Sequence, residues 1–314
     1  MSVDSDVAEI GVICGPTAAG KSAVALWLAG SHPVTIISAD SRQIYRDFDI
    51  GTAKPTRIEQ ARVPHRGIDI VDPTERYSAA AWADAAEGWI EEARRSNRIP
   101  LVVGGTGLYL RALFEGLFVE PPLDPTLRAS LETILGELSV DELRRWVEVL
   151  DPPRAHLGRP QLLRAVEIAL LTGQRLSDLH RSSTRPARWR PRYLLVDPGA
   201  GLASRIAERI DEMLDHGWPD EVRGLMQTVP EDAPAWNATG YDTVRALVRG
   251  DLSRLAAREQ ILIATRQYAK RQRTWFRNQL PSDRVTQLDP RSVGWEHAVA
   301  AWAQTGLRAA QGIA

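Results

Sequence analysis

The chain of 314 residues has a single cysteine, Cys14, no Cys-x-x-Cys pair and only six histidines. One cysteine excludes an internal disulfide, and so few cysteines and histidines exclude the usual kinds of zinc site. No apolar run approaches the roughly 18 residues that a membrane helix requires. The first fifteen residues carry acids where a signal peptide needs basic residues. We therefore expect a cytoplasmic protein with no membrane partner.

The chain also has almost no net charge, because its 39 basic and 40 acidic residues give a net charge of −1. This average gives no sign of a polyanionic partner, and 44% hydrophobic with 25% charged residues is typical of a globular protein of about two domains. Two tracts depart from it: residues 154–192 carry a net charge of +7 and residues 254–284 a net charge of +6, with tryptophan and tyrosine interleaved. Such tracts are typical of surfaces that follow an RNA backbone.

Short apolar runs alternate with helical patterns in the first third of the chain. Residues 9–14, 34–38 and 98–103 have the composition of buried strands, each followed by glycine or by Asp-Ser. Residues 22–29 favour a helix, and Ser78 is placed to cap a second one. Continuously apolar strands that alternate with helices indicate a parallel sheet with helices on both faces.

Beyond residue 121 the pattern becomes purely helical, with helical periodicity at residues 127–135, 140–149 and 162–171. Residues 193–196 then indicate a return to the sheet, followed by long helices at 202–214 and 255–276. The sequence therefore predicts an α/β core in two parts, 1–118 and 188–314, with an all-α insert at 119–187.

The first predicted strand runs into GPTAAGKS, which matches the full pattern G-x-x-x-x-G-K-[ST]. Glycines let successive backbone N–H groups surround phosphate oxygens, and the N-terminus of the following helix adds a positive field. Lys21 supplies a mobile positive charge, and the Ser22 hydroxyl is a ligand for Mg²⁺. We predict that a di- or triphosphate is bound by Gly15, Pro16, Thr17, Ala18, Ala19, Gly20, Lys21 and Ser22.

The phosphate loop alone leaves the chemistry open among ATPases, small-molecule kinases and enzymes that hold a diphosphate leaving group. The third predicted strand runs into GGTG at residues 104–107 and lacks the acidic residue of an ATP-driven motor or switch. Asp40 ends the second predicted strand, where open α/β sheets place ligand-contacting residues, although an aspartate there is often only a helix cap.

A series of blocks resembles one family closely, the tRNA dimethylallyltransferases. The resemblance spans residues 10–280 and is carried by GPTAAGKS (15–22), ISADSRQIY (37–45), DIGTAKP (49–55), VPHRGIDIVDP (63–73), YSAA (77–80), GGTGLYLRAL (104–113), RAVEI (164–168), TG (172–173), RIAERIDEML (205–214), GY (240–241) and ATRQYAKRQRTWFR (264–277). It implies a P-loop NTPase-like parallel sheet flanked by helices, with an inserted all-α domain.

The resemblance also implies a reaction, transfer of a five-carbon group from dimethylallyl diphosphate to N6 of the adenosine 3′-adjacent to the anticodon in tRNA. It makes Asp40 the catalytic base, adds Thr17 as a hydroxyl donor to the diphosphate and makes Arg209 the arginine that reaches the diphosphate from the opposite side. Mg²⁺ is the implied cofactor, with Ser22 as its protein ligand. By spacing alone, Arg209 near two acids would be a solvated helix residue.

Contacts to tRNA are implied for Asp40, Ser41, Arg42, Gln43, Thr106, Arg128, Gln161, Leu162, Leu163, Arg164 and Ala165. Gln161 stands where family members usually have an arginine. Tyr109 and Tyr241 are candidates either for stacking on the base or for the core. We expect a monomer, and the competing functions are a P-loop small-molecule kinase and a non-catalytic RNA-binding ATPase.

Overall fold

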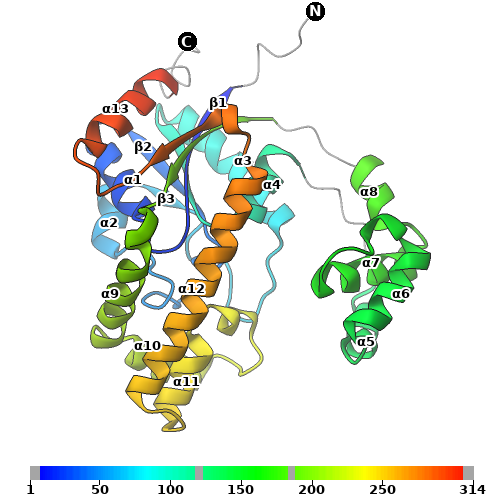
Figure 1. The fold of residues 1–314 in the computed structure, drawn as a ribbon. Helices are drawn as coiled ribbons and strands as arrows, with labels where there is room; N and C mark the ends of the chain where they lie inside the picture. The colour runs from blue at the N-terminus through cyan, green and yellow to red at the C-terminus, as the bar shows by residue number, and fades with distance from the viewer. Residues whose placement is uncertain (1–7, 117–122, 183–187, 307–314) are drawn as a thin grey trace, which may run out of the picture. The chain divides into compact units, whose positions relative to one another are not determined.

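The computed structural model describes residues 8–116, 123–182 and 188–306. The chain divides into two compact units, an α/β unit of residues 1–114 with 188–314 and a helical unit of residues 115–187. The boundary predicted between residues 118 and 119 lies outside the described residues. Figure 1 shows both units, and each is described by itself below.

A six-stranded parallel sheet forms the centre of the α/β unit, in the order β3-β2-β4-β1-β5-β6. The strands are β1 (Glu9–Cys14), β2 (Val34–Ala39), β3 (His65–Arg66), β4 (Ile99–Gly104), β5 (Arg190–Val196) and β6 (Val285–Leu288). β1 lies between β4 and β5, with Ile13 opposite Val103 on one side and Leu194 on the other. The predicted fold class is confirmed, because every strand pair is parallel and helices flank the sheet.

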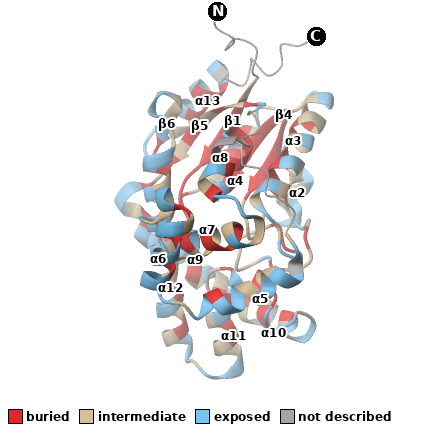
Figure 2. Ribbon diagram, turned by 90° about the vertical axis from the view of Figure 1, so that its right-hand side faces the viewer, coloured by how far each residue is buried: buried red, intermediate tan, exposed pale blue. Residues whose placement is uncertain are grey.

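Helices pack on both faces of this sheet, and Figure 2 shows the buried strands between exposed helix surfaces. On one face α1 (Lys21–Ala29) and α13 (Trp295–Gly306) contribute Leu28 and Trp302 to a core cluster that also holds Ile13 and Val103. α3 (Ala79–Arg95), which Ser78 caps through the Ala81 N–H, packs with α4 (Gly107–Phe114) and contacts β2 and β4. A short α2 (Arg57–Arg62) precedes β3.

The C-terminal part of the α/β unit is mostly helical, with α9 (Leu202–Asp215), α10 (Trp218–Thr228), α11 (Tyr241–Arg249) and the long α12 (Arg254–Gln279). α12 packs along α9 and α11 and also reaches α4 (Figure 1). α12 therefore runs from α9 and α11 to α4, which follows the carboxyl end of β4. No helix within the described ranges is long and apolar enough to cross a membrane.

The helical unit contains α5 (Pro125–Gly136), α6 (Val140–Leu150), α7 (Arg159–Thr172) and α8 (Leu176–Ser182). Asp124 caps α5 and a capping box of Ser139 and Glu142 begins α6. Its core is apolar and is centred on the fully buried Leu143 and Val147 of α6 and Leu162 of α7. These helices bury one stripe each, which is the pattern that the sequence predicts.

Candidate functional site

The glycine-rich segment joins the end of β1 to the start of α1, as its sequence pattern requires. Gly15 has φ 148°, and a Cβ atom there would lie 2.1 Å from the carbonyl oxygen of Val196 on the neighbouring strand β5. Any side chain at this position would therefore displace the loop from the sheet. Gly20, with φ 100°, stands immediately before the first turn of α1, so the free N–H groups of that turn face the loop.

Two backbone N–H groups of this loop are used within the protein. The Thr17 N–H donates to Gln272 Oε1 at 2.8 Å, and the Ala19 N–H donates to the Pro16 carbonyl at 3.3 Å. Gln272 is a buried residue of α12, and its Nε2 donates to the Gly105 carbonyl at 2.9 Å. One glutamine thus connects the phosphate loop to the GGTG segment. The sequence shows it only as a polar residue within a basic tract.

Lys21 points back across the loop, and its Nζ donates to the Pro16 carbonyl at 2.8 Å. Burial lowers the pKa of Lys21 to about 8; Asp40 acts in the opposite direction and the Arg209 guanidinium lowers the pKa further. An anion bound in the loop would therefore stabilise the charged form of Lys21. The chain has only three lysines, and Lys21 and Lys54 both line the cavity described next.

A cavity of about 280 Å³ brings together predicted site residues from separate elements. Its lining includes Thr17, Lys21, Ser22, Asp40, Gln43 and Arg209. Asp40 follows β2 at the carboxyl edge of the sheet, and Arg209 comes from α9. An acid at the end of one strand and a phosphate loop at the end of another meet here because parallel strands present the same ends at one edge.

Asp40 and Arg209 are both half-buried and directed to this cavity. Asp40 Oδ1 accepts the Arg42 N–H at 2.9 Å, and its other oxygen has no hydrogen-bond donor among the described residues. Burial lowers the pKa of Arg209, with Asp40 acting in the opposite direction, and an arginine remains charged nonetheless. Arg209 forms no ion pair or hydrogen bond within the described part of the chain, so its donors are free for an anion.

The segment after Asp40 is held against the GGTG loop. Thr106 Oγ1 accepts the Ser41 N–H at 3.0 Å, and the Tyr268 side chain of α12 also bonds to Thr106. Burial, with Asp40 as a smaller contributor, raises the pKa of Tyr268 to about 12, so this phenol stays neutral. Tyr268 lines the cavity as well, and sequence reasoning placed it only among the aromatics of a basic tract.

A smaller, more apolar pocket of about 80 Å³ lies beside the first and shares Thr17, Asp40 and Arg209 with it. Its further lining includes Ile206, Ile210, Met213, Trp218 and Ile261. Charged groups therefore line one side of this space and aliphatic and aromatic groups the other. The periodicity of α9 predicts buried positions but not that they face a pocket.

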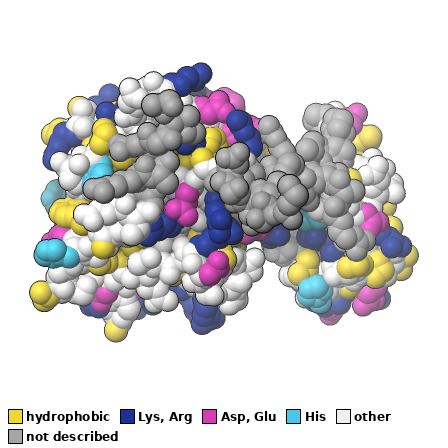
Figure 3. Space-filling view, turned by 90° about the horizontal axis from the view of Figure 1, so that it is seen from above, with side chains coloured by type: hydrophobic (Ala, Val, Ile, Leu, Met, Phe, Trp, Pro, Cys, Tyr) yellow, Lys and Arg dark blue, Asp and Glu magenta, His cyan; other side chains and the backbone are white. Residues whose placement is uncertain are grey.

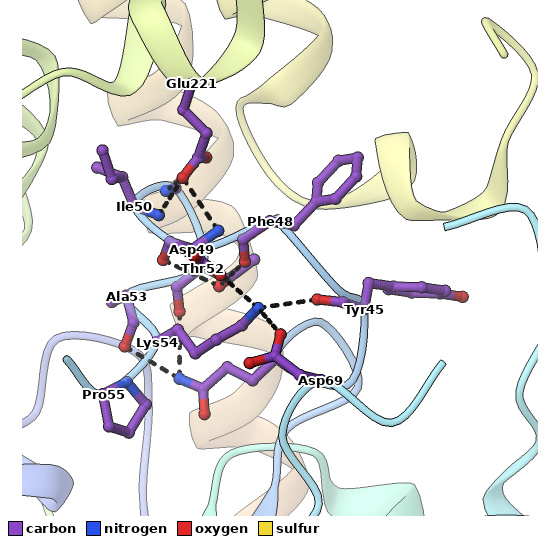
Figure 4. A network of polar contacts seen from close by, with 12 residues as sticks. Tyr45, Phe48, Asp49, Ile50, Thr52, Ala53, Lys54, Pro55, Asp69 and Glu221 are labelled. Atoms are coloured by element: carbon purple, nitrogen blue, oxygen red, sulfur yellow. Dashed lines mark hydrogen bonds and ion pairs between the residues drawn. The ribbon is translucent and has the colours of Figure 1, made fainter. Parts of the chain in front are cut away.

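The loop of residues 48–55 forms one wall of both spaces (Figure 4). Lys54, whose side chain is 2% exposed, bonds to the Tyr45 carbonyl and to the carboxylates of Asp49 and Asp69 at 2.5–2.8 Å. Gln43 Nε2 donates to the Ala53 carbonyl at 3.0 Å, and Gln43 Oε1 accepts the Ser38 hydroxyl hydrogen at 2.9 Å. Both polar ends of Gln43 are thus already engaged within the protein.

The residues present fit a magnesium ion held mainly by a bound diphosphate. The Ser22 hydroxyl and the Asp40 carboxylate line the same cavity, whereas no cluster of three or more His, Cys, Asp or Glu side chains among the described residues forms a complete metal cage. Mg²⁺ usually keeps several waters and uses one or two protein oxygens together with phosphate oxygens. The donor set is therefore of the right kind.

In the helical unit, Glu167 brings Arg128 of α5 and Arg164 of α7 together. Arg128 Nε lies 2.6 Å from Glu167 Oε1, and Arg164 pairs with the other carboxylate oxygen. Glu167 is buried, while the two arginines keep 37% and 24% of their side chains exposed. Two predicted RNA contacts that are 36 positions apart in sequence are therefore neighbours.

Leu162 and Ala165, which we also expected to contact tRNA, have fully buried side chains in the core of the helical unit. Within residues 161–165, only the Gln161 side chain is exposed, while Leu163 and Arg164 are partly buried. Tyr109 and Tyr241, left open between stacking and packing, are both core residues: Tyr109 stacks on Trp82 at 4.6 Å, and Tyr241 is fully buried.

The two basic tracts are less uniformly basic in space than in sequence, and Figure 3 shows basic and acidic side chains intermingled on the face in view. Arg188 pairs with Glu87 and Glu91 of α3, and Arg159 bonds to carbonyls at the end of α5. Along α12 three arginines are paired with acids, but Arg266, Lys270 and Arg277 are exposed and form no ion pair among the described residues. Their spacing places them along one side of the helix.

Comparisons with known proteins point to one family. The family model described as IPP transferase matches residues 43–279, and that described as isopentenyl transferase matches residues 8–64. A tRNA dimethylallyltransferase of Synechococcus is 42% identical over 271 residues, which cover 85% of this chain and 86% of the relative.

Two solved structures are similar to this chain over most of its length. The tRNA isopentenylpyrophosphate transferase of Bacillus halodurans is 31% identical, with a TM-score of 0.69 over 96% of this chain and 97% of the other. A eukaryotic dimethylallyltransferase acting on tRNA is 26% identical, with a TM-score of 0.79 over 94% of this chain and 77% of the other.

Proposed function

The chain belongs to the IPP transferase family, and on this premise we propose that it is a tRNA dimethylallyltransferase that uses dimethylallyl diphosphate to convert an adenosine 3′-adjacent to the anticodon into N6-isopentenyladenosine. One observation carries the proposal: a single cavity joins a phosphate loop, the Asp40 carboxylate and the Arg209 guanidinium, which has no ion pair among the described residues. This arrangement suits alkyl transfer, in which an anionic leaving group departs while an amine loses a proton.

The phosphate loop and Arg209 hold the diphosphate of the donor. The free N–H groups at the start of α1, the Lys21 ammonium and the Thr17 hydroxyl donate to its oxygens, and Arg209 approaches from α9. As the bond between the first carbon of the dimethylallyl group and the diphosphate oxygen breaks, negative charge grows on the diphosphate. These preorganised donors stabilise that charge.

Asp40 accepts the proton that the exocyclic amine of adenosine loses as the new nitrogen–carbon bond forms. One of its oxygens is fixed by the Arg42 N–H, and the other is free to bond to the amine. Lys21 and Arg209 are nearby positive charges, and each interacts electrostatically with Asp40. The proton and the diphosphate therefore leave toward different groups of the same cavity.

The apolar pocket beside the cavity is complementary to the five-carbon chain. Ile206, Met213 and Trp218 offer the hydrophobic contacts that such a chain requires, and they keep water from the reacting carbon. Mg²⁺ would be held by Ser22 and the diphosphate oxygens, and when bound it neutralises charge on the leaving group. The residues of the chain itself bind the substrates, orient them and exclude water.

Recognition of tRNA needs positive charge outside the cavity. The row Arg266, Lys270 and Arg277 on α12 supplies it, and Arg128 and Arg164 add to it because they share the buried Glu167 and remain partly exposed. Ser41, Arg42 and Thr106 lie beside Asp40, which supports their proposed role in contacting the extruded nucleotide. We further propose that the protein acts in the cytoplasm as a monomer.

The decisive experiment follows the label from radiolabelled dimethylallyl diphosphate with Mg²⁺ into tRNA. We expect N6-isopentenyladenosine in a tRNA that has adenosine beside the anticodon and no label when guanosine replaces that adenosine. Bound tRNA without label would contradict the proposal. Consumption of ATP without RNA would favour the small-molecule kinase, and RNA-dependent ATP hydrolysis without alkylation would favour the RNA-binding ATPase.

A further inference from the structure

Glu221 lies outside every block by which the sequence resembles its family, yet it holds the loop of residues 48–55. Its carboxylate accepts the N–H groups of Asp49, Ile50 and Gly51 at 3.0, 2.6 and 3.5 Å (Figure 4). Glu221 comes from α10, 170 positions further along the chain than Gly51. The contact is therefore a tertiary anchor and not part of a local turn.

A second residue completes this anchor. The Tyr241 hydroxyl at the start of α11 donates to Glu221 Oε1 at 2.7 Å, and its ring is fully buried against Phe48 and Trp218. No basic side chain among the described residues pairs with Glu221, so three amides and one phenol are its donors. Burial raises the pKa of Glu221, while the Ile50 N–H and the Tyr241 hydroxyl act in the opposite direction.

The same loop is held from its other side by Lys54 and Gln43, so its backbone has little freedom. Ala53 has a left-handed φ of 51°, which a non-glycine residue adopts only when its surroundings enforce it. A Cβ atom on Gly51 would lie 2.2 Å from Trp218 Nε1, so the loop packs on α10 without spare room. These contacts therefore hold the loop in a single conformation.

That position matters because Thr52 and Ala53 line both the polar cavity and the apolar pocket, where Asp40 and Arg209 also lie. We propose that Glu221, assisted by Tyr241, is a positioning residue of the transferase: it fixes the 48–55 loop so that the wall of the reaction space stays closed around the dimethylallyl group. This inference rests on the proposed function. Glu221 itself lines neither the cavity nor the apolar pocket, so its effect would pass through the loop backbone.

Three variants and one control test this role. Glu221→Gln keeps the size of the side chain but turns an N–H₂ group toward backbone N–H donors, so at least one bond to the loop is broken. Glu221→Asp keeps a carboxylate on a shorter stem, and Tyr241→Phe removes one donor while it keeps the ring. Asp220→Asn on the same helix is the matched control, because Asp220 is exposed and, among the described residues, forms its ion pair with Arg223 alone.

We expect Glu221→Gln to lower kcat by about tenfold to a hundredfold, since small misplacements of reacting groups cost that much. The Kd for tRNA should stay within about twofold, because the proposed phosphate contacts lie on other elements. Glu221→Asp should recover part of kcat, Tyr241→Phe should reduce kcat about threefold, and Asp220→Asn should match the wild type. Hydrogen exchange at the amides of residues 49–51 should accelerate in Glu221→Gln and stay unchanged in Asp220→Asn.

Several outcomes would contradict the proposed role of Glu221. Faster exchange at residues 49–51 with an unchanged kcat would overturn the inference, because the loop would then be free without consequence. A loss of kcat that merely follows the unfolded fraction at the assay temperature would also overturn it in favour of a general role in stability. No transfer by the wild-type enzyme would refute the proposed function and this inference with it, whereas normal wild-type transfer isolates the role of Glu221.

Discussion

Each unit of the molecule contains a largely buried glutamate, and the two glutamates hold different kinds of partner. Glu221 in the α/β unit accepts three backbone N–H groups and one phenol, whereas Glu167 in the helical unit pairs with two arginines. The first fixes the shape of a loop around the reaction space. The second fixes the direction of two half-exposed cations. The α/β unit should therefore respond to changes of geometry in kcat, and the helical unit to changes of charge in RNA binding.

Replacement of Asp40 should have the strongest effect of all, and it tests this contrast within the α/β unit. Asp40→Asn keeps the size of the side chain but removes the base, so kcat should fall by about 10²–10⁴-fold. Binding of tRNA should be largely kept, since phosphate contacts dominate affinity. The measurement pairs single-turnover transfer with a filter-binding Kd.

The matched variant in the helical unit is Arg164→Ala. It should raise the Kd for tRNA and leave kcat at saturating tRNA close to that of the wild type. If Arg164→Ala lowered kcat at saturating tRNA as much as Asp40→Asn does, the division of labour between the units would be wrong.

The next effect concerns the stability of the helical unit. Glu167→Gln leaves Arg128 and Arg164 close together without their shared counter-charge, which should cost on the order of 2 kcal/mol, a factor of about 30 in local opening. Hydrogen exchange at the amides of α5 and α7 reports this directly. Glu132→Gln removes an exposed i,i+4 partner of Arg128 and should cost a few tenths of a kcal/mol, about the value of such pairs. Equal effects of the two variants would contradict a special role for Glu167.

A smaller effect separates the units by pH. The pKa of Lys21 is lowered to about 8 in the folded protein without ligand, so diphosphate binding above pH 8 must add a proton to Lys21. We expect kcat/KM for the donor to fall about tenfold per pH unit above 8 and Lys21→Arg to flatten that fall. The Kd for tRNA should show no inflection near pH 8, because Lys21 is not among the proposed tRNA contacts and the arginines among those contacts do not titrate in this range.

Protein stability should move in the opposite direction over part of this range. Between pH 8 and 10.5 the unfolded chain binds the Lys21 proton more tightly than the folded chain, so the contribution of Lys21 to stability rises with pH. Comparison of wild type and Lys21→Met in denaturant titrations at about pH 7.5 and about pH 10 measures it. A stability of the wild type relative to Lys21→Met that decreases toward the higher pH would contradict the lowered pKa.

Much of the α/β unit could be predicted because its signals are local. The apolar runs of β1, β2 and β4 are continuous, and the phosphate loop is a single uninterrupted pattern. β3, with two residues, and β6, at the sheet edge, carry too little apolar pattern to be recognised. The site residues that come from α10 and α12 could not be predicted from the sequence. Gln272, Tyr268 and Glu221 contact partners far away in the sequence, and only folding brings them together.

The distribution of positive charge is the property for which the prediction from sequence differs most from the structure. The basic tract of residues 154–192 has the composition of one RNA surface, but Arg159 closes the end of α5 and Arg188 pairs with two acids of α3. A charge count along the sequence cannot include acids that fold in from elsewhere. On α12, the exposed cations without an ion pair among the described residues include the row Arg266, Lys270 and Arg277. The final prediction tests this row.

The double variant Arg266→Ala with Lys270→Ala should weaken tRNA binding and reduce the slope of log Kd against log salt by about 1 to 2, because a protein that neutralises fewer phosphates releases fewer counterions. Its kcat at saturating tRNA should be unchanged. The matched control on the same helix is Arg254→Ala with Arg258→Ala, since these arginines pair with Asp215 and Asp211. If the control changes the salt slope as much as the test variant, ion pairing within the protein does not decide which arginines reach RNA. In that case the whole basic tract, and not the unpaired row, would be the better description of the surface.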